Sequence, residues 1–182
     1  MHKQLRLFLT ANSFFALAAG MLGPIYALFV KQIGGDVLAA SGAWATFMIV
    51  SGLGIFLMGK IQDKIKREKP VIIIGYFLQS LGFLGYFFVS NIVQLFIVQV
   101  ILGVSLMIQI PVFNSFYTKY LEKGKYASQW AAWEGLYFTI TGIAALIGGF
   151  VVKFFDFKFL FLMMFGLSLI GLALSTQLKE EK

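Results

Sequence analysis

Long apolar stretches separated by short polar breaks follow one another along the whole chain. Six such stretches lie at 7–30, 38–59, 70–90, 92–117, 127–152 and 157–177. Each is long enough for a helix to cross a bilayer, which takes about 20 mostly apolar residues. Strands of a membrane barrel need only about ten residues and alternate apolar with polar positions, which these stretches rarely do. The pattern predicts an all-α membrane protein with six transmembrane helices in a single domain, 1–182.

The composition agrees with a membrane protein and narrows its chemistry. Of 182 residues, 59% are hydrophobic and only 13% are charged, which excludes a soluble globular domain and a disordered chain. The chain has no cysteine, and its one histidine is His2. Thiolate nucleophiles, disulfides and imidazole bases inside the membrane are therefore excluded. We expect neither an enzyme nor a bound cofactor or metal ion.

The basic residues divide unequally between the two sides of the predicted membrane. With the N-terminus in the cytoplasm, the cytoplasmic segments hold twelve of them: Lys3, Arg6, Lys60, Lys64, Lys66, Arg67, Lys69, Lys119, Lys123, Lys125, Lys179 and Lys182. The opposite side holds three: Lys31, Lys153 and Lys158. This bias predicts that both termini are cytoplasmic. Because the charges are spread over separate loops, we expect no nucleic-acid partner. The first apolar run has no cleavage-type site, so we expect an uncleaved anchor in the cytoplasmic (inner) membrane of a prokaryote.

One carboxylate lies deep in a predicted span. Glu134 follows Lys125 by nine residues, which is about 13 Å along a helix. A charge at that depth costs on the order of 3 kcal/mol or more, so we expect desolvation to favour its protonated form. Glu134 either binds a solute or a proton, or forms a hydrogen bond that fixes a helix pair. Its neighbours Trp130, Trp133 and Tyr137 either stack on a substrate or anchor the helix at the membrane interface.

The fourth predicted helix is the most polar, and Pro111 interrupts it. Gln94, Ser105 and Gln109 share a face within about 60°, which we expect to point into the bundle or a cavity. Hydrogen bonding between helices explains such a face equally well. The candidate substrate or coupling residues are Asn12, Gln99, Gln109, Asn114, Trp130, Trp133, Glu134 and Tyr137.

Small residues recur on one face of the second and fifth predicted helices. The second helix carries Ser41, Ala45, Gly52 and Gly59, and the fifth carries Ala127, Ala131, Ala145 and Gly149 with Gly142 close by. Small faces allow membrane helices to approach closely. They indicate either ordinary packing or surfaces that slide during a conformational change.

The loop after the second helix reads Gly-Lys-Ile-Gln-Asp-Lys-Ile-Lys-Arg over residues 59–67. It resembles the loop motif G-x-L-x-D-R-x-G-R-K of the major facilitator superfamily, at the place where that family carries it. Gly59, Asp63 and Arg67 match, and Lys64 is a conservative replacement, whereas Lys66 and Glu68 depart from the motif. The pair at 148–149 matches the double glycine that ends the family's fifth helix. The family's arginine on helix four is Gln99 here, and its antiporter Gly-Pro is replaced at 144–145 by Ala-Ala.

The resemblance covers one six-helix half, itself an inverted repeat of three plus three helices, of the usual twelve-helix transporter. It implies a secondary transporter of a small solute that works by alternating access. Since one half cannot enclose a site between two halves, we expect a parallel homodimer of twelve helices with the site on the two-fold axis. Helices one and four would line the cavity, and helix two would pack on helix five of the mate. Gly59, Asp63, Lys64 and Arg67 would form a cytoplasmic gating motif, with Asp63 near the first turn of the mate's helix five.

Other interpretations remain open from the sequence. The chain pairs with a different half encoded by another gene, or it is a membrane scaffold or assembly protein that retains the fold without transporting. A passive channel is disfavoured, because the chain has no filter-like repeat or ring of charges. Membrane lipid and a small-molecule substrate are the expected partners besides a second copy.

Overall fold

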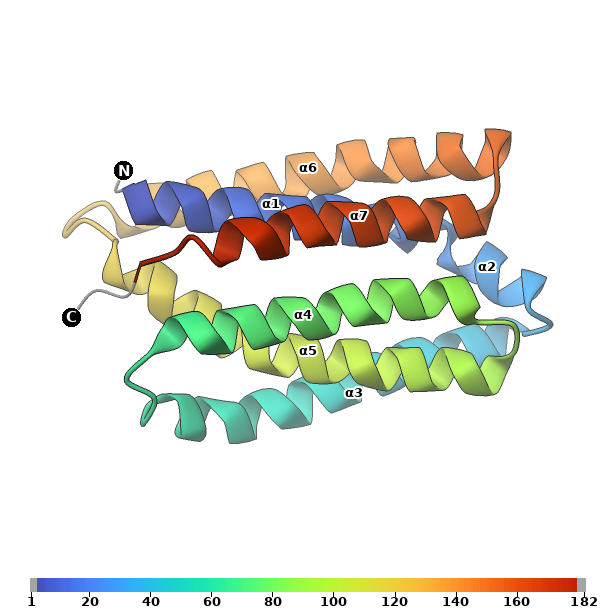
Figure 1. Cartoon of the computed structure of the whole chain (residues 1–182), viewed down its shortest axis with the longest axis horizontal. Coiled ribbons are helices and arrows are strands. Elements are labelled where there is room, and N and C mark those ends of the chain that lie inside the picture. Colours follow the sequence, from blue (N-terminus) through green and yellow to red (C-terminus); the bar gives the residue numbers. More distant parts are fainter. Residues whose placement is uncertain (1–2, 180–182) are drawn as a thin grey trace.

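The computed structural model describes residues 3–179, and nearly all of them are helical (Figure 1). The helices are α1 (Lys3–Leu22), the 3₁₀ turn η1 (Gly23–Ile25), α2 (Tyr26–Gln32), α3 (Val37–Gln62), α4 (Glu68–Phe88), α5 (Ile92–Lys119), α6 (Tyr126–Phe154) and α7 (Phe157–Ser175). With α1 to α2 taken as one span, six helices are long and apolar enough to cross a membrane. The all-α class and the six apolar spans predicted from the sequence are therefore confirmed.

The first span is not the continuous helix that residues 7–30 predicted. Gly23 and Pro24 begin a 3₁₀ turn that separates α1 from α2. Proline has no backbone N–H and its ring obstructs the preceding turn of an α-helix, which explains the interruption. The short α2 then places Tyr26 and Phe29 in the core.

Three helices begin at the end of the bundle opposite the chain termini, and each begins with a side-chain cap. Asp36 accepts from the amide of Ala39 at 2.8 Å, Asn91 from Gln94 at 3.0 Å and Asp156 from Phe159 at 2.7 Å. Such caps satisfy amides that the first turn leaves unpaired. These residues start α3, α5 and α7, and we call this end of the bundle the capped end (Figure 1, right).

The helices pack as two related groups of three. α1 packs on α6 and α7, α5 packs on α3 and α4, and α4 packs on α7. Exchanging α1, α3 and α4 for α5, α6 and α7 converts α1–α6 into α5–α3 and α1–α7 into α5–α4, and it leaves α4–α7 unchanged. The two groups also enter the bundle from opposite ends (Figure 1), so the arrangement is that of an inverted three-plus-three repeat.

α3 and α6 are the least enclosed spans. Only Ala43, Ser51 and Gly54 of α3 are buried, and α6 buries Trp133 and three residues of its second half. On that half α6 approaches α1 closely, because a Cβ at Gly148 would lie 1.9 Å from the backbone oxygen of Met21. The opposite faces of both helices have no partner among residues 3–179.

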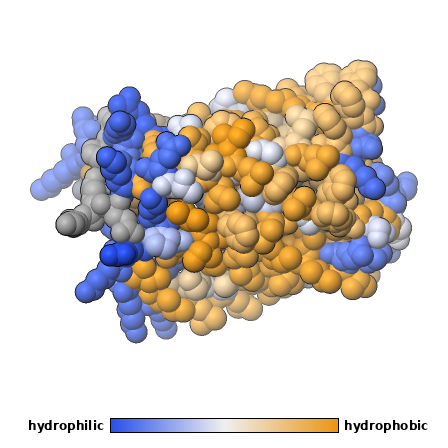
Figure 2. Space-filling view, in the orientation of Figure 1, coloured by the Kyte–Doolittle hydropathy of each residue, from blue (hydrophilic) through white to orange (hydrophobic). Residues whose placement is uncertain are grey.

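The surface shows an apolar band between two polar ends (Figure 2). At the end that holds both chain termini, which we call the basic end, lie eleven of the twelve basic residues assigned above to the cytoplasm. The twelfth, Lys182, and the histidine His2 lie outside the described residues. Lys31, Lys153 and Lys158 lie at the capped end.

Candidate functional site

The groove between α1 and α5 contains several of the polar candidate residues, including Asn12, Gln99 and Gln109. At the basic end, aromatic rings bridge it: the centroid of Phe8 lies 5.2 Å from Phe113 and 4.5 Å from Phe116. At the capped end, Nε2 of Gln99 donates to the Tyr26 hydroxyl at 2.6 Å. Two neighbouring cavities lie between these contacts, and Leu106 lines both.

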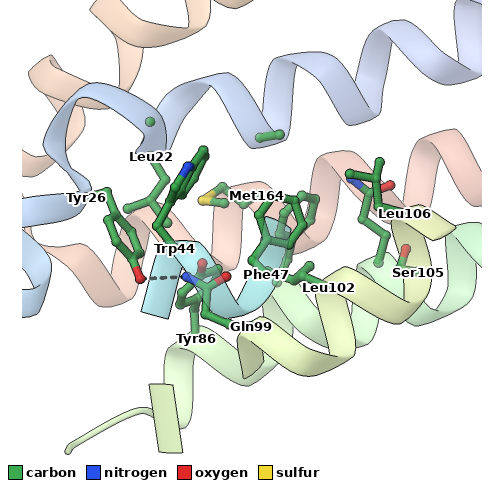
Figure 3. A pocket seen from close by; sticks show the side chains of 14 residues that line it. Leu22, Tyr26, Trp44, Phe47, Tyr86, Gln99, Leu102, Ser105, Leu106 and Met164 are labelled. Atoms are coloured by element: carbon green, nitrogen blue, oxygen red, sulfur yellow. Dashed lines mark hydrogen bonds between the residues drawn. The ribbon is translucent and has the colours of Figure 1, made fainter. Parts of the chain in front are cut away.

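The smaller cavity, about 130 Å³, is surrounded by five of the spans and is mostly apolar (Figure 3). Gln99 and Tyr26 hydrogen-bond at one end of it, and Ser105 lies toward the other. Gln79 also lines it, with a buried Oε1 that has no hydrogen-bond partner within residues 3–179. Gln99 is thus a structural partner of Tyr26 in this cavity, apart from the other candidate residues.

The larger cavity, which we call the Glu134 cavity, has a volume of about 390 Å³ and is open to the surface. Side chains of α1, α5 and α6 line it: Asn12, Leu106, Gln109, Ile110, Phe113, Asn114, Trp130, Trp133, Glu134 and Tyr137. Seven of the eight candidate residues from the sequence therefore meet in one cavity, the exception being Gln99.

Glu134 lies on the open face of α6 rather than inside the chain. Its side chain is exposed on the surface of the single chain. The face that it shares with Ala131 and Phe138, residues at helical spacing, is the one that α1 and α5 leave uncovered. Within residues 3–179, no basic side chain forms an ion pair with it.

Aromatic rings form a continuous wall beside Glu134. The centroid of Trp133 lies 5.1 Å from Phe113 and 6.0 Å from Tyr137, and that of Trp130 lies 4.6 Å from Tyr117. Trp133 is buried, whereas Tyr137 is exposed. The wall therefore runs from the core of the chain to its open face.

Two of the three amides that line the cavity donate hydrogen bonds to groups elsewhere in the bundle. Nδ2 of Asn12 donates to the backbone oxygen of Phe8 at 3.0 Å. Nε2 of Gln109 donates to the carbonyl of Gly75 on α4 at 3.1 Å and to the Ser105 hydroxyl at 2.6 Å. The polar face of α5 thus joins α5 to α4 by hydrogen bonds. Gln94, placed on the same face from the sequence, lies at the capped end and accepts from Ser90.

The loop motif lies at the basic end, where α3 turns into α4. Gly59 and Asp63 line a cavity of about 290 Å³ together with Glu68 and the α5 residues Pro111, Val112, Ser115 and Lys119. Asp63 is the C-cap of α3 and is exposed, and it forms no ion pair within residues 3–179. Lys64 and Arg67 are exposed too. The motif is therefore presented outward.

Three apolar residues of the Glu134 cavity were not among the candidates predicted from the sequence, namely Leu106, Ile110 and Phe113. Each of them lies three or four residues from Gln109 or Asn114 in the sequence. Since residues at that spacing share a face of a helix, they could have been predicted to line the same cavity. No group of three or more Asp, Glu, His or Cys side chains in the described part of the chain is arranged to hold a metal ion.

A family model described as Major Facilitator Superfamily matches residues 8–181. The chain belongs to the major facilitator superfamily. A relative named "Uncharacterized MFS-type transporter YitZ", from Bacillus subtilis (strain 168), is 25% identical over 147 residues, which are 79% of this chain and 87% of the relative. That relative is therefore about as long as this chain. As a major facilitator superfamily member with six apolar spans, the chain is a multi-pass membrane transporter and not an enzyme.

Proposed function

We propose that the chain is a secondary transporter of a small solute, working by alternating access as a parallel homodimer with its cavity at the two-fold axis. The observation that carries this proposal is the placement of Glu134. It belongs to a membrane-spanning helix, yet it lies in an open cavity on an uncovered face. A carboxylate facing lipid costs about 3 kcal/mol or more. A second copy that closes the cavity would remove that contact with lipid.

The charge distribution supports an orientation with the basic end in the cytoplasm. Eleven described basic residues lie at that end against three at the capped end. Positive charge favours the cytoplasmic side of a membrane. Both termini would then be cytoplasmic, and the membrane would be the cell membrane of a prokaryote.

The open faces of α3 and α6 support pairing between copies. A Cβ placed on Gly52 or Gly59 of α3, or on Gly142 or Gly149 of α6, would meet nothing within 4 Å. These glycines belong to the two faces of small residues that the sequence predicted on these helices. Since small faces favour close contact between membrane helices, α3 of one copy would pack on α6 of its mate.

A contact between the two copies at the basic end, which we call the latch, would couple the packing of α3 on the mate's α6 to gating. α6 begins without a side-chain cap and without an acidic residue in its first turn, and Ala127 and Ser128 there are exposed. A helix N-terminus attracts a carboxylate. Asp63 of the mate would supply it, and breaking that contact would open the cavity toward the cytoplasm.

Disulfide cross-linking tests the dimer without knowledge of the substrate, because the chain has no native cysteine. Ser41→Cys with Gly149→Cys, and Gly59→Cys with Ala131→Cys, would pair α3 of one copy with α6 of the other near the capped and basic ends. We expect cross-linked dimers in membranes from both double variants. Leu81→Cys with Leu169→Cys, on the exposed faces of α4 and α7, is the matched control and should give no cross-linked dimer.

Accessibility of the cavity tests alternating access. Asn114→Cys should react with a membrane-impermeant maleimide from the basic side, and the Gly59→Cys/Ala131→Cys cross-link should block that reaction.

A monomer by native mass spectrometry in a membrane mimic, with no cross-link at either end, would overturn the proposal. Recovery of a different six-helix chain in the cross-linked product would replace the homodimer by a heterodimer. Unchanged labelling in the cross-linked dimer would favour a scaffold that does not transport.

A further inference from the structure

We infer that the Glu134 cavity takes an organic cation with an aromatic body. This inference rests on the proposed transport function, because it names the chemical class of the solute carried. It follows from three features of the same cavity: its charge, its aromatic wall and the direction of its amides.

The charge of the lining is negative. Glu134 is the only carboxylic acid among the ten lining residues, and no lysine, arginine or histidine is among them. The basic residues closest in sequence, Lys123 and Lys125, belong to the exposed α5–α6 connection. A cation entering this cavity would therefore meet an unpaired carboxylate, whereas an anion would meet only repulsion.

The aromatic wall selects an organic cation over a metal ion. Phe113, Trp133 and Tyr137 form successive ring contacts, at 5.1 and 6.0 Å between centroids, and Trp130 lines the same cavity. Indole and phenol faces attract cations within about 6 Å and stack on flat apolar bodies. A hard metal ion instead requires six or more oxygen ligands. One carboxylate and three amides do not provide that number in one copy.

The amides complete an acceptor-rich lining. Asn12 and Gln109 use their N–H groups on Phe8 and on Gly75 with Ser105. Both N–H groups of Gln109 and one of Asn12 are therefore already bonded, whereas an amide carbonyl oxygen in this lining can accept a hydrogen bond from the N–H group of a cation. The cavity volume of about 390 Å³ lies within the range of about 300 to 1,000 Å³ typical of small-molecule sites.

Ethidium, a planar aromatic cation, is a suitable probe, with fluorescein as an anion that is also planar and aromatic. We expect ethidium to bind the wild-type chain in nanodiscs with a rise in its fluorescence, and fluorescein not to bind. Glu134→Gln should weaken ethidium binding at least tenfold, and Tyr137→Leu should weaken it severalfold. Asp156→Asn is the matched control: it also removes one carboxylate, but Asn still caps α7, so binding should equal that of the wild type.

A second measurement uses only the wild-type chain, which keeps the inference testable if a variant fails to fold. Dicyclohexylcarbodiimide, an apolar reagent that modifies carboxyl groups, should modify Glu134, as mapped by mass spectrometry, and ethidium should slow that modification. Equal binding by wild type and Glu134→Gln, equal binding of fluorescein, or modification of Glu134 at the same rate with and without ethidium would overturn the inference. A cross-linked dimer that changes access but binds no ethidium would refute this solute class and leave the proposed function standing. Ethidium binding at Glu134 of a stable monomer would refute the proposed dimer instead.

Discussion

The carboxylate of Glu68 pairs with the ammonium group of Lys119 at 2.8 Å and also accepts from the hydroxyl of Ser115 at 2.6 Å. These contacts join the first turn of α4 to the last turns of α5, beyond Pro111. Glu68 is the residue that replaces the closing lysine of the family's loop motif. These contacts explain why an acidic side chain is found at this position: it holds the end of α5 against the loop that carries Asp63.

Replacing Glu68 by Gln should lower the free energy of unfolding by about 1 kcal/mol, because a charged hydrogen bond and a partly exposed ion pair are lost. For a chain of this length that corresponds to a fall in Tm of about 2 to 4 °C. Thermal unfolding in detergent measures it, and the difference should shrink at high salt. A double-mutant cycle with Lys119→Met should show coupling, whereas a cycle with Lys123→Met should show none. Equal coupling in both cycles would contradict a specific pair.

The α5–α6 connection should respond to pH through Glu122. The hydrogen bond and charge of Lys125, at 2.7 Å, hold the pKa of the Glu122 carboxyl below its ordinary value. A lowered pKa in the folded state stabilises the fold above the unfolded pKa of about 4.5, and this contribution is lost as the pH falls through the folded value. Glu122→Gln should therefore have a lower Tm than the wild type near neutral pH, and the two values should converge in acid. A difference that is the same at pH 7 and pH 3 would contradict this assignment.

The sequence predicted the spans because length and apolar content are local properties of the chain. The polar breaks it identified contain Asp36 and Asn91, which cap α3 and α5. The interruption at Gly23–Pro24 was also encoded locally. The break was not predicted because the apolar run continues through it. Hydropathy does not show that proline lacks the backbone N–H that an α-helix needs.

The cavity was predictable as a set of residues but not as a geometry. Polar and aromatic side chains in spans indicated Glu134 and its neighbours, and the structure brings seven candidates together. The partner of Gln99 is Tyr26, 73 positions away, and that of Gln109 is Gly75, 34 positions away. Such pairs depend on the register between packed helices, which a local pattern does not contain. The depth of Glu134 along its helix was predictable, but the uncovered face on which it lies was not.

Neutralising Asp63 should alter gating without weakening the fold. Asp63 is the C-cap of α3. The negative end of the helix dipole lies there and destabilises a charged carboxylate by about a few tenths of a kcal/mol. Asp63→Asn should therefore keep or slightly raise the Tm. Without the carboxylate the latch on the mate's α6 would be lost, so labelling of Asn114→Cys from the basic side should increase severalfold. Asp36→Asn, which keeps the cap of α3 at the other end, is the control. Unchanged labelling in Asp63→Asn would show that Asp63 holds no latch.

The adjacent glycines Gly148 and Gly149 should separate folding from dimerisation, because neighbouring residues on a helix point about 100° apart. A Cβ at Gly148 would collide with the backbone of Met21, 1.9 Å from its oxygen, whereas one at Gly149 would meet nothing within 4 Å. Gly148→Ala should push α1 from α6 and destabilise the chain by about 1 to 3 kcal/mol or more. Gly149→Ala should leave Tm unchanged or raise it, since Ala favours a helix interior by about 1 kcal/mol.

Gly149→Leu should fold equally well, but it places a large side chain on the face of small residues that would contact the mate. It should therefore lower the dimer fraction measured by native mass spectrometry. A full dimer fraction in Gly149→Leu would show that this face of α6 does not form the interface.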